Sequence, residues 1–186
     1  MAQAEAMLAA GGEVWVADET ALREFPPLHA RWSKRGKPAR VVISGRNTRR
    51  TILGALNVTT GELVHIVRER CRTDDVLAVV EALGAVRPKV PKLLIWDNAP
   101  PHLPHRVRDT AQAAGITIAF LPFRSPELMP LEELWRGLKG TVAANRCYAS
   151  LEDLAERSLV WLDAMSNVER RRRCGLTTSK FAWLPT

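Results

Sequence analysis

A chain of 186 residues is long enough for one domain of ordinary size, and its 46% hydrophobic residues provide for a sizeable core. The 27 basic and 20 acidic residues leave a net charge of +7, which favours a polyanionic partner. No apolar run approaches the roughly 18 residues that span a membrane. The three cysteines are far apart and show no zinc-finger or disulfide spacing, so we expect a protein of the reducing cytoplasm.

The first part of the chain is typical of strands and turns. Residues 1–12 are rich in alanine and lack a basic segment, so we expect a linker or N-terminal extension rather than a signal peptide. Residues 13–18 predict a strand, and residues 19–38, with Pro26, Pro27 and Gly36, predict a loop. The other strands expected in this part are 40–44 and the hairpin pair 51–58 and 63–67, which turns at Gly61.

The second part alternates helices and strands. A helix capped by Thr73 ends near Gly84, and its apolar positions share one face. The elements expected after it are a strand over 92–96, a helix over 102–114, a strand over 116–121, helices over 127–144 and 151–165, and a peripheral basic tail over 166–186. This order predicts one α/β domain with a mixed sheet over residues 13–165.

Three acids stand out because of what precedes them. Asp18 ends the apolar run 14–17, Asp97 ends the apolar run 93–96, and Glu132 lies in the segment that opens a predicted helix. Each acid alone could be an ordinary turn or cap residue. Together they would suit Mg²⁺, which binds a few carboxylates, waters and substrate phosphates. Two such ions can hold the attacking and leaving oxygens of a phosphodiester.

Two neighbouring acids compete with these candidates. Glu19 follows Asp18, but successive side chains of a strand face opposite ways, so only one of the two can enter the site. In the predicted helix, Glu133 lies nearly opposite the face formed by Leu131 and Leu134, whereas Glu132 lies at its margin. We therefore expect Glu132 to face the sheet edge and Glu133 to be solvated.

The segments around the three acids resemble a known family. Val16 to Thr20, Trp96 to His102 and Ser125 to Glu132, followed by Trp135, are similar to the catalytic motifs of DDE transposases of the mariner-like superfamily, in its bacterial insertion-sequence branch. The interval from Asp97 to Glu132, residues 98 to 131 or 34 residues, is common in that superfamily. The resemblance covers about residues 13–140, and Met129 stands where the family usually has asparagine.

The resemblance implies a ribonuclease-H-like α/β fold and a metal-dependent reaction. Asp18, Asp97 and Glu132 would be the catalytic residues and would hold two Mg²⁺ ions, for which Mn²⁺ can substitute. The implied reaction is cleavage at the ends of a DNA element and transfer of the freed 3′-hydroxyl into target DNA. The implied partners are double-stranded DNA, a second copy of the chain on that DNA, and a separate or missing N-terminal helix-turn-helix module. The implied location is the bacterial cytoplasm, at the nucleoid.

Several further residues are candidates for contact with nucleic acid. They are Asn98, His102, Arg35, Lys37, Arg46, Arg49, Arg50 and Lys139. Cations of this kind contact phosphate and provide affinity without reading sequence, although such runs are more often solvated surface. His102 could instead form a structural hydrogen bond. No cysteine or histidine pair accompanies it at ligand spacing, so a zinc site is not expected there.

Two other functions remain open at this point. A nuclease of the same fold would cut DNA without joining it, and a DNA-binding remnant of a truncated element would do neither. A glycosidase would also use paired carboxylates, but nothing else in the chain indicates a sugar cleft.

Overall fold

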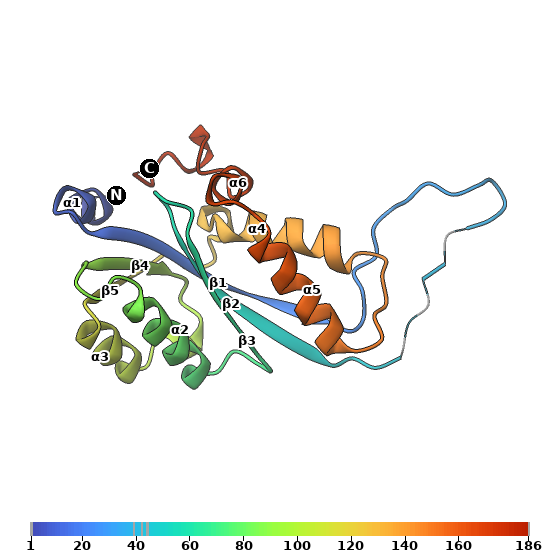
Figure 1. The fold of residues 1–186 in the computed structure, drawn as a ribbon, viewed down its shortest axis with the longest axis horizontal. Coiled ribbons are helices and arrows are strands. Elements are labelled where there is room, and N and C mark those ends of the chain that lie inside the picture. Colours follow the sequence, from blue (N-terminus) through green and yellow to red (C-terminus); the bar gives the residue numbers. More distant parts are fainter. Residues whose placement is uncertain (1, 39, 42, 44, 186) are drawn as a thin grey trace.

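Five strands form one mixed sheet in the order β3-β2-β1-β4-β5 (Figure 1), in a computed structural model that describes residues 2–38, 40–41, 43 and 45–185. The strands are β1 (Glu13–Arg23), β2 (Arg49–Asn57), β3 (Leu63–Arg68), β4 (Lys92–Trp96) and β5 (Ile116–Phe120). The pairs β1–β2 and β2–β3 are antiparallel, whereas β1–β4 and β4–β5 are parallel. The expected mixed sheet is therefore present.

Helices cover both faces of the sheet. The helices α2 (Thr73–Ala85) and α3 (His105–Ala113) lie on one face, and α4 (Leu131–Leu138) and α5 (Leu151–Asp163) lie on the other (Figure 1). Along β1 the side chains alternate between two cores, because Val14 and Val16 pack in the α4–α5 core while Trp15 and Ala17 pack in the α2–α3 core. This alternation decides which face each acid of the strand can reach.

Strand β1 is longer than the sequence predicts. Its pairing with β2 continues to Arg23, opposite Arg49, because Thr20 and Leu22 remain buried against the sheet. Residues 19–23, expected in a loop, are therefore strand. The strand expected over 40–44 is absent at residues 40, 41 and 43, and residues 42 and 44 lie outside the described part of the chain.

Prolines shorten two of the expected helices. The helix expected over 102–114 is a 3₁₀ turn (Pro100–His102) followed by α3, which starts at His105 after Pro104. The helix expected over 127–144 is a 3₁₀ turn (Pro126–Leu128), then α4 after Pro130, then a π turn (Lys139–Ala143). Proline is tolerated at a helix start and interrupts a helix elsewhere.

The helix caps match the sequence in one case and differ in the other. Arg72, rather than Thr73, is the N-cap of α2, and its backbone N–H donates to the Asp75 carboxylate at 2.9 Å. Ser150 caps α5 as expected, since its hydroxyl accepts the Asp153 backbone N–H at 3.1 Å. Both caps satisfy donors that a helix start leaves free.

The two ends of the described chain pack onto the domain. Helix α1 (Ala2–Ala9) buries Ala4 in the α4–α5 core. Helix α6 (Asn167–Arg173) and a 3₁₀ turn (Ser179–Phe181) follow α5, and Leu176, Phe181 and Leu184 are buried in that same core. Residues 166–185 are therefore not the peripheral tail that their basic composition suggests. Across the described residues, no helix is both long and apolar enough to cross a membrane.

Candidate metal centre

The strand register brings Asp18 and Asp97 to the same place. Val16 pairs with Ile95 in the parallel β1–β4 ladder, and each acid follows two residues later on the face covered by α4. Glu132 belongs to the first turn of α4. All three acids line one cavity of about 280 Å³, together with Asn98 and Met129. Two strand ends and one helix start thus supply three carboxylates to a shared space.

Asp18 is the most deeply placed of the three acids. It is 8% exposed, and its Oδ2 atom has no hydrogen-bond partner among the described residues. Burial, and after it the negative charges of Glu19, Glu132 and Asp97, raise the pKa of Asp18 well above its ordinary value. A bound cation would stabilise a buried carboxylate that has no hydrogen-bond partner and lies beside other carboxylates.

Asp97 is held in position by His102 and by a backbone N–H. Its Oδ1 atom forms an ion pair with His102 Nδ1 at 2.7 Å and accepts the Ala99 backbone N–H at 3.0 Å, while His102 Nδ1–H donates to the Asp97 backbone carbonyl at 3.3 Å. The bond from His102 holds the pKa of Asp97 below its usual range, more than burial raises it. The side chain is 48% exposed, so Asp97 is an ionised carboxylate at the mouth of the cavity.

Helix α4 separates its two glutamates. Leu131, Leu134 and Trp135 form its buried face. Glu132 lines the cavity, whereas Glu133 forms ion pairs with Arg136, at 2.7 Å, and with Lys180. The two glutamates therefore have different surroundings although they are adjacent in the chain.

The two polar candidates that follow Asp97 have different positions. Asn98 lines the cavity, and its Nδ2 donates to the Leu121 backbone carbonyl, which fixes the amide beside the acids. His102 is fully buried. The expectation that His102 contacts nucleic acid is wrong, because a side chain without exposed surface cannot reach a phosphate.

The basic candidates lie on and around the long segment between β1 and β2, which extends away from the sheet (Figure 1). Arg35 and Lys37 are exposed there. Arg46 pairs with Glu24 at 3.1 Å, and Arg50 pairs with Glu152. The remaining two candidates are Arg49, which is exposed, and Lys139, which lines a second cavity of about 600 Å³.

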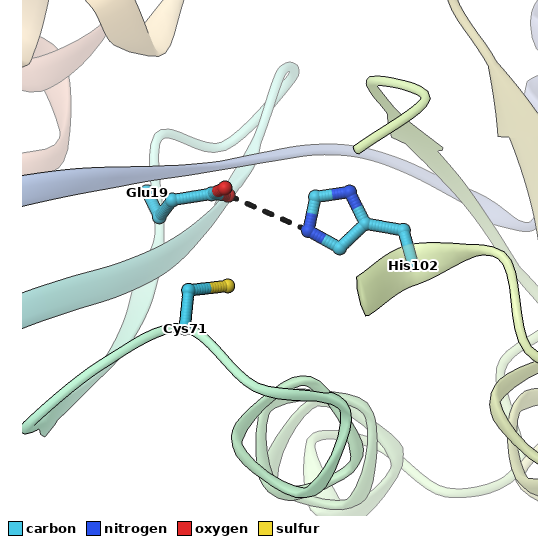
Figure 2. A group of neighbouring side chains, drawn as sticks. All are labelled: Glu19, Cys71 and His102. Atoms are coloured by element: carbon cyan, nitrogen blue, oxygen red, sulfur yellow. Dashed lines mark ion pairs between the residues drawn. The ribbon is translucent and has the colours of Figure 1, made fainter. Parts of the chain in front are cut away.

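Sequence reasoning missed a second group of polar side chains. Glu19, Cys71 and His102 converge on the α2 side of the sheet (Figure 2). The alternation along β1 indicated that Glu19 faces away from Asp18, but nothing in the sequence indicated that Cys71 would meet it.

Burial by itself would lower the pKa of His102. Interactions with Asp97, Cys71 and Glu19 outweigh it and raise that pKa to about 11. Without a metal ion, His102 is therefore an imidazolium between two carboxylates at neutral pH.

Comparisons with known proteins identify a family and a fold. A family model described as DDE superfamily endonuclease matches residues 13–155. A protein of Shigella sonnei named insertion element IS630 uncharacterized 39 kDa protein is 25% identical over 158 residues, which are 82% of this chain and 45% of that protein. The chain therefore spans about half the length of that relative.

Solved structures of similar fold come from a transposase. A paired-end complex of Mos1 transposase with its left transposon end has a TM-score of 0.68 and 17% identity, over 98% of this chain and 60% of that one. The catalytic domain of Mos1 mariner transposase has a TM-score of 0.65 and 16% identity, over 97% of this chain and 87% of that one. The α/β sheet described above is therefore a ribonuclease-H-like fold.

Proposed function

This chain belongs to the family of DDE superfamily endonucleases, and we propose that it carries the catalytic centre of a DNA transposase. The single observation that supports this function best is the convergence of Asp18, Asp97 and Glu132 on one cavity. The reaction we propose is hydrolysis of a phosphodiester at each end of a DNA element, followed by transfer of the 3′-hydroxyl into target DNA.

The donors in the cavity suit a hard divalent cation. Carboxylate oxygens are the ligands that Mg²⁺ prefers, and the cavity offers three acids, one of which has a buried oxygen without a hydrogen-bond partner among the described residues. Mos1 paired-end complexes have been solved with Mg and with Mn. We propose that Asp18, Asp97 and Glu132 would hold two Mg²⁺ ions, or Mn²⁺ in their place.

The bound ions would supply an acidified water and stabilise charge on the phosphate. The chain itself orients the ligands. His102 orients the Asp97 carboxylate through the ion pair of its Nδ1 with Oδ1 at 2.7 Å, and Asp97 lines the cavity. Asn98, anchored by the Leu121 carbonyl, presents its amide beside Asp97, where it would contact the DNA backbone.

The partners follow from the same proposal. Double-stranded DNA would be the substrate, with Arg35, Lys37, Arg46, Arg49, Arg50 and Lys139 near its phosphates. A second copy of the chain on that DNA, and a helix-turn-helix module that recognises the element's ends, belong to the proposal as well.

Substitution of the acids tests the function. Asp18→Asn and Glu132→Gln should abolish the Mn²⁺-dependent nicking of a supercoiled plasmid while DNA affinity is kept, because each removes one ligand charge and no surface cation. Removal of a residue that only supports a metal ligand typically lowers activity by about 10–100-fold. Removal of a ligand itself should lower the nicking rate by more than that. Gel separation of supercoiled and open-circular plasmid measures it.

Glu133→Gln is the matched control, since Glu133 lies in the same first turn of α4 as Glu132 but pairs with Arg136 and Lys180 outside the cavity. It should nick at the wild-type rate. Full nicking by Asp18→Asn or Glu132→Gln would refute the ligand roles. A labelled DNA end carrying a 3′-hydroxyl, incubated with target plasmid, separates a transposase, which joins the two, from a nuclease that only cuts.

A further inference from the structure

A second cluster of potential metal ligands lies behind the acidic cavity. Glu19 comes from β1, Cys71 from the turn before α2, and His102 from the 3₁₀ turn after β4, and the three side chains point toward one another (Figure 2). One donor atom from each residue lies within 4.8 Å of the other two. Three segments far apart in the sequence thus deliver an oxygen, a sulfur and a nitrogen to one point.

The facing atoms of this cluster have unsatisfied hydrogen-bonding capacity. His102 is fully buried, and its Nε2 atom lies 3.5 Å from Glu19 Oε2. Within the described residues, neither of these buried atoms has a hydrogen-bond partner of good geometry. Buried polar atoms left in this condition call for an explanation such as an ion.

The other nitrogen of His102 has the partner that metal-binding histidines use. Nδ1 donates to the Asp97 backbone carbonyl at 3.3 Å and forms an ion pair with the Asp97 carboxylate at 2.7 Å, and the ring packs against Trp96, tilted by 31°, with the centroids 4.2 Å apart. In proteins, a histidine that ligates a metal almost always donates its second N–H to a carboxylate, a carbonyl or water, which fixes its orientation. Nε2 is therefore held in position toward Glu19 and Cys71.

We propose that Glu19, Cys71 and His102 form a binding site for a Zn²⁺-class divalent cation, separate from the acidic cavity. Thiolate, imidazole and carboxylate are the ligands that Zn²⁺ takes, and thiolate sulfur disfavours Mg²⁺. A thiolate, a carboxylate and a neutral imidazole also balance the ion's two charges, which favours binding in a partly buried site. Three protein ligands leave a fourth position open to water.

The proposed site differs from the acidic cavity in the face of the sheet that it occupies. Glu19 and Asp18 are adjacent in β1 and point to opposite faces, so the two sites share no ligand. His102 joins them, because it would ligate the zinc ion and position Asp97 at once. The zinc ion would tie β1, the turn before α2 and the turn after β4 together.

The competing explanation is an ion pair without a metal, in which a protonated His102 bridges Glu19 and Asp97. Cobalt distinguishes the two, because Co²⁺ replaces Zn²⁺ in such sites and a cobalt–thiolate bond gives an intense charge-transfer band in the near ultraviolet. The full reduced chain, titrated with CoCl₂, should develop this band at one equivalent, and Zn²⁺ should bleach it while Mg²⁺ should not.

Single substitutions assign the band to Cys71. Cys71→Ser should abolish it, and Cys147→Ser, at an exposed cysteine away from the cluster, should leave it unchanged. Asp18→Asn should also keep the band, because the acidic cavity contributes no sulfur. Absence of the band from the wild type, or its persistence in Cys71→Ser, would overturn the zinc site.

Alkylation of the wild type gives a second measurement that needs no variant to fold. Zn²⁺ should slow the reaction of Cys71 with iodoacetamide at least about tenfold, as followed by peptide mass spectrometry, and leave Cys147 unaffected. Equal alkylation of Cys71 with and without Zn²⁺ would overturn the proposal. Neither result depends on DNA cleavage, so the zinc site and the transposase function can fail separately.

Discussion

At the scale of single residues, the acidic cavity disfavours a negative charge on Asp18. The raised pKa of Asp18, caused first by burial and then by Glu19, Glu132 and Asp97, means that the folded protein resists ionising this carboxyl group. The unfolded chain releases the proton near pH 4. Stability is therefore lost as the pH rises from that value through the folded-state pKa.

Removal of this charge should stabilise the metal-free protein. In EDTA at pH 7, Asp18→Asn should melt a few degrees above the wild type, since about 1 kcal/mol corresponds to about 2–4 °C in a domain of this size. The difference should vanish well below pH 4, where the wild-type carboxyl is protonated in both states. Calorimetry at the two pH values measures it.

Millimolar Mn²⁺ should reverse the order, because only the wild type retains all three ligands and gains stability by binding the ion. A variant that melts below the wild type in EDTA at pH 7 would show that the Asp18 charge does not cost stability.

The sequence pattern predicted where some of the polar side chains lie, but not all of them. The alternation of side chains along β1 was enough to predict that Asp18 and Glu19 face opposite sides of the sheet, because the backbone fixes the period of a strand. Cys71 could not be found in this way. Its proximity to His102 depends on where the turn before α2 passes, and that path results from the packing of α2 on the sheet.

At the scale of elements, Glu132 is positioned by the contact between α4 and β2. Gly54 pairs with Asp18 across the β1–β2 ladder. The ring of Trp135 lies so close above it that a Cβ on residue 54 would be 2.9 Å from the ring. Helix α4 can lie this near to the sheet because position 54 has no side chain, and the acid of its first turn reaches the cavity as a result.

Gly54→Ala should therefore damage both the fold and the site. The added methyl group must push Trp135 and α4 away from the sheet, which should lower the free energy of unfolding by about 1–3 kcal/mol, as overpacking of a core does. Nicking at saturating Mn²⁺ should fall as Glu132 moves. Urea unfolding and the plasmid assay measure the two effects.

Gly137→Ala is the control on the other side of the same helix. A Cβ there would lie 3.5 Å from the Trp161 ring, an ordinary contact, and alanine is the better helix former. This variant should be at least as stable as the wild type and nick normally. Wild-type behaviour of Gly54→Ala would show that the contact with Trp135 does not position α4.

Most helices and strands could be predicted from the sequence, but the residues at which they begin and end could not. The apolar runs before Asp18 and Asp97 predicted β1 and β4, because continuous burial marks the central strands of a sheet. The end of β1 was missed because residues 19–23 look polar on one side while Leu22 is buried on the other. The start of α4 was missed because Pro130 follows a separate 3₁₀ turn.

At the scale of the whole molecule, part of the positive charge lies on the segment between β1 and β2. The segment between β1 and β2 extends from the body (Figure 1), and its exposed Arg35 and Lys37 form no ion pair within the part of the chain that the structure describes. Trp32 is fully exposed in the same segment, so it is not part of the hydrophobic core. This segment is the part of the surface best suited to approach DNA phosphate.

Binding of DNA should therefore depend on this segment and on salt. Lys37→Glu should weaken the affinity for random duplex, and make the slope of log affinity against log salt shallower by about 1, as loss of one phosphate contact does. Lys89→Glu makes the same charge change at an exposed position before β4 and should have a smaller effect. Fluorescence anisotropy over a salt series measures both, and equal effects would exclude a special role for the segment.

The packing of residues 176–184 has a consequence for the order in which the protein acquires its activity. Leu176, Phe181 and Leu184 complete the core beneath α4, and Lys180 pairs with Glu133, the neighbour of Glu132. All three acids leave the ribosome before these residues do. During translation, α4 therefore lacks the support of residues 176–184 until they have emerged, although Asp18, Asp97 and Glu132 have all been made by then.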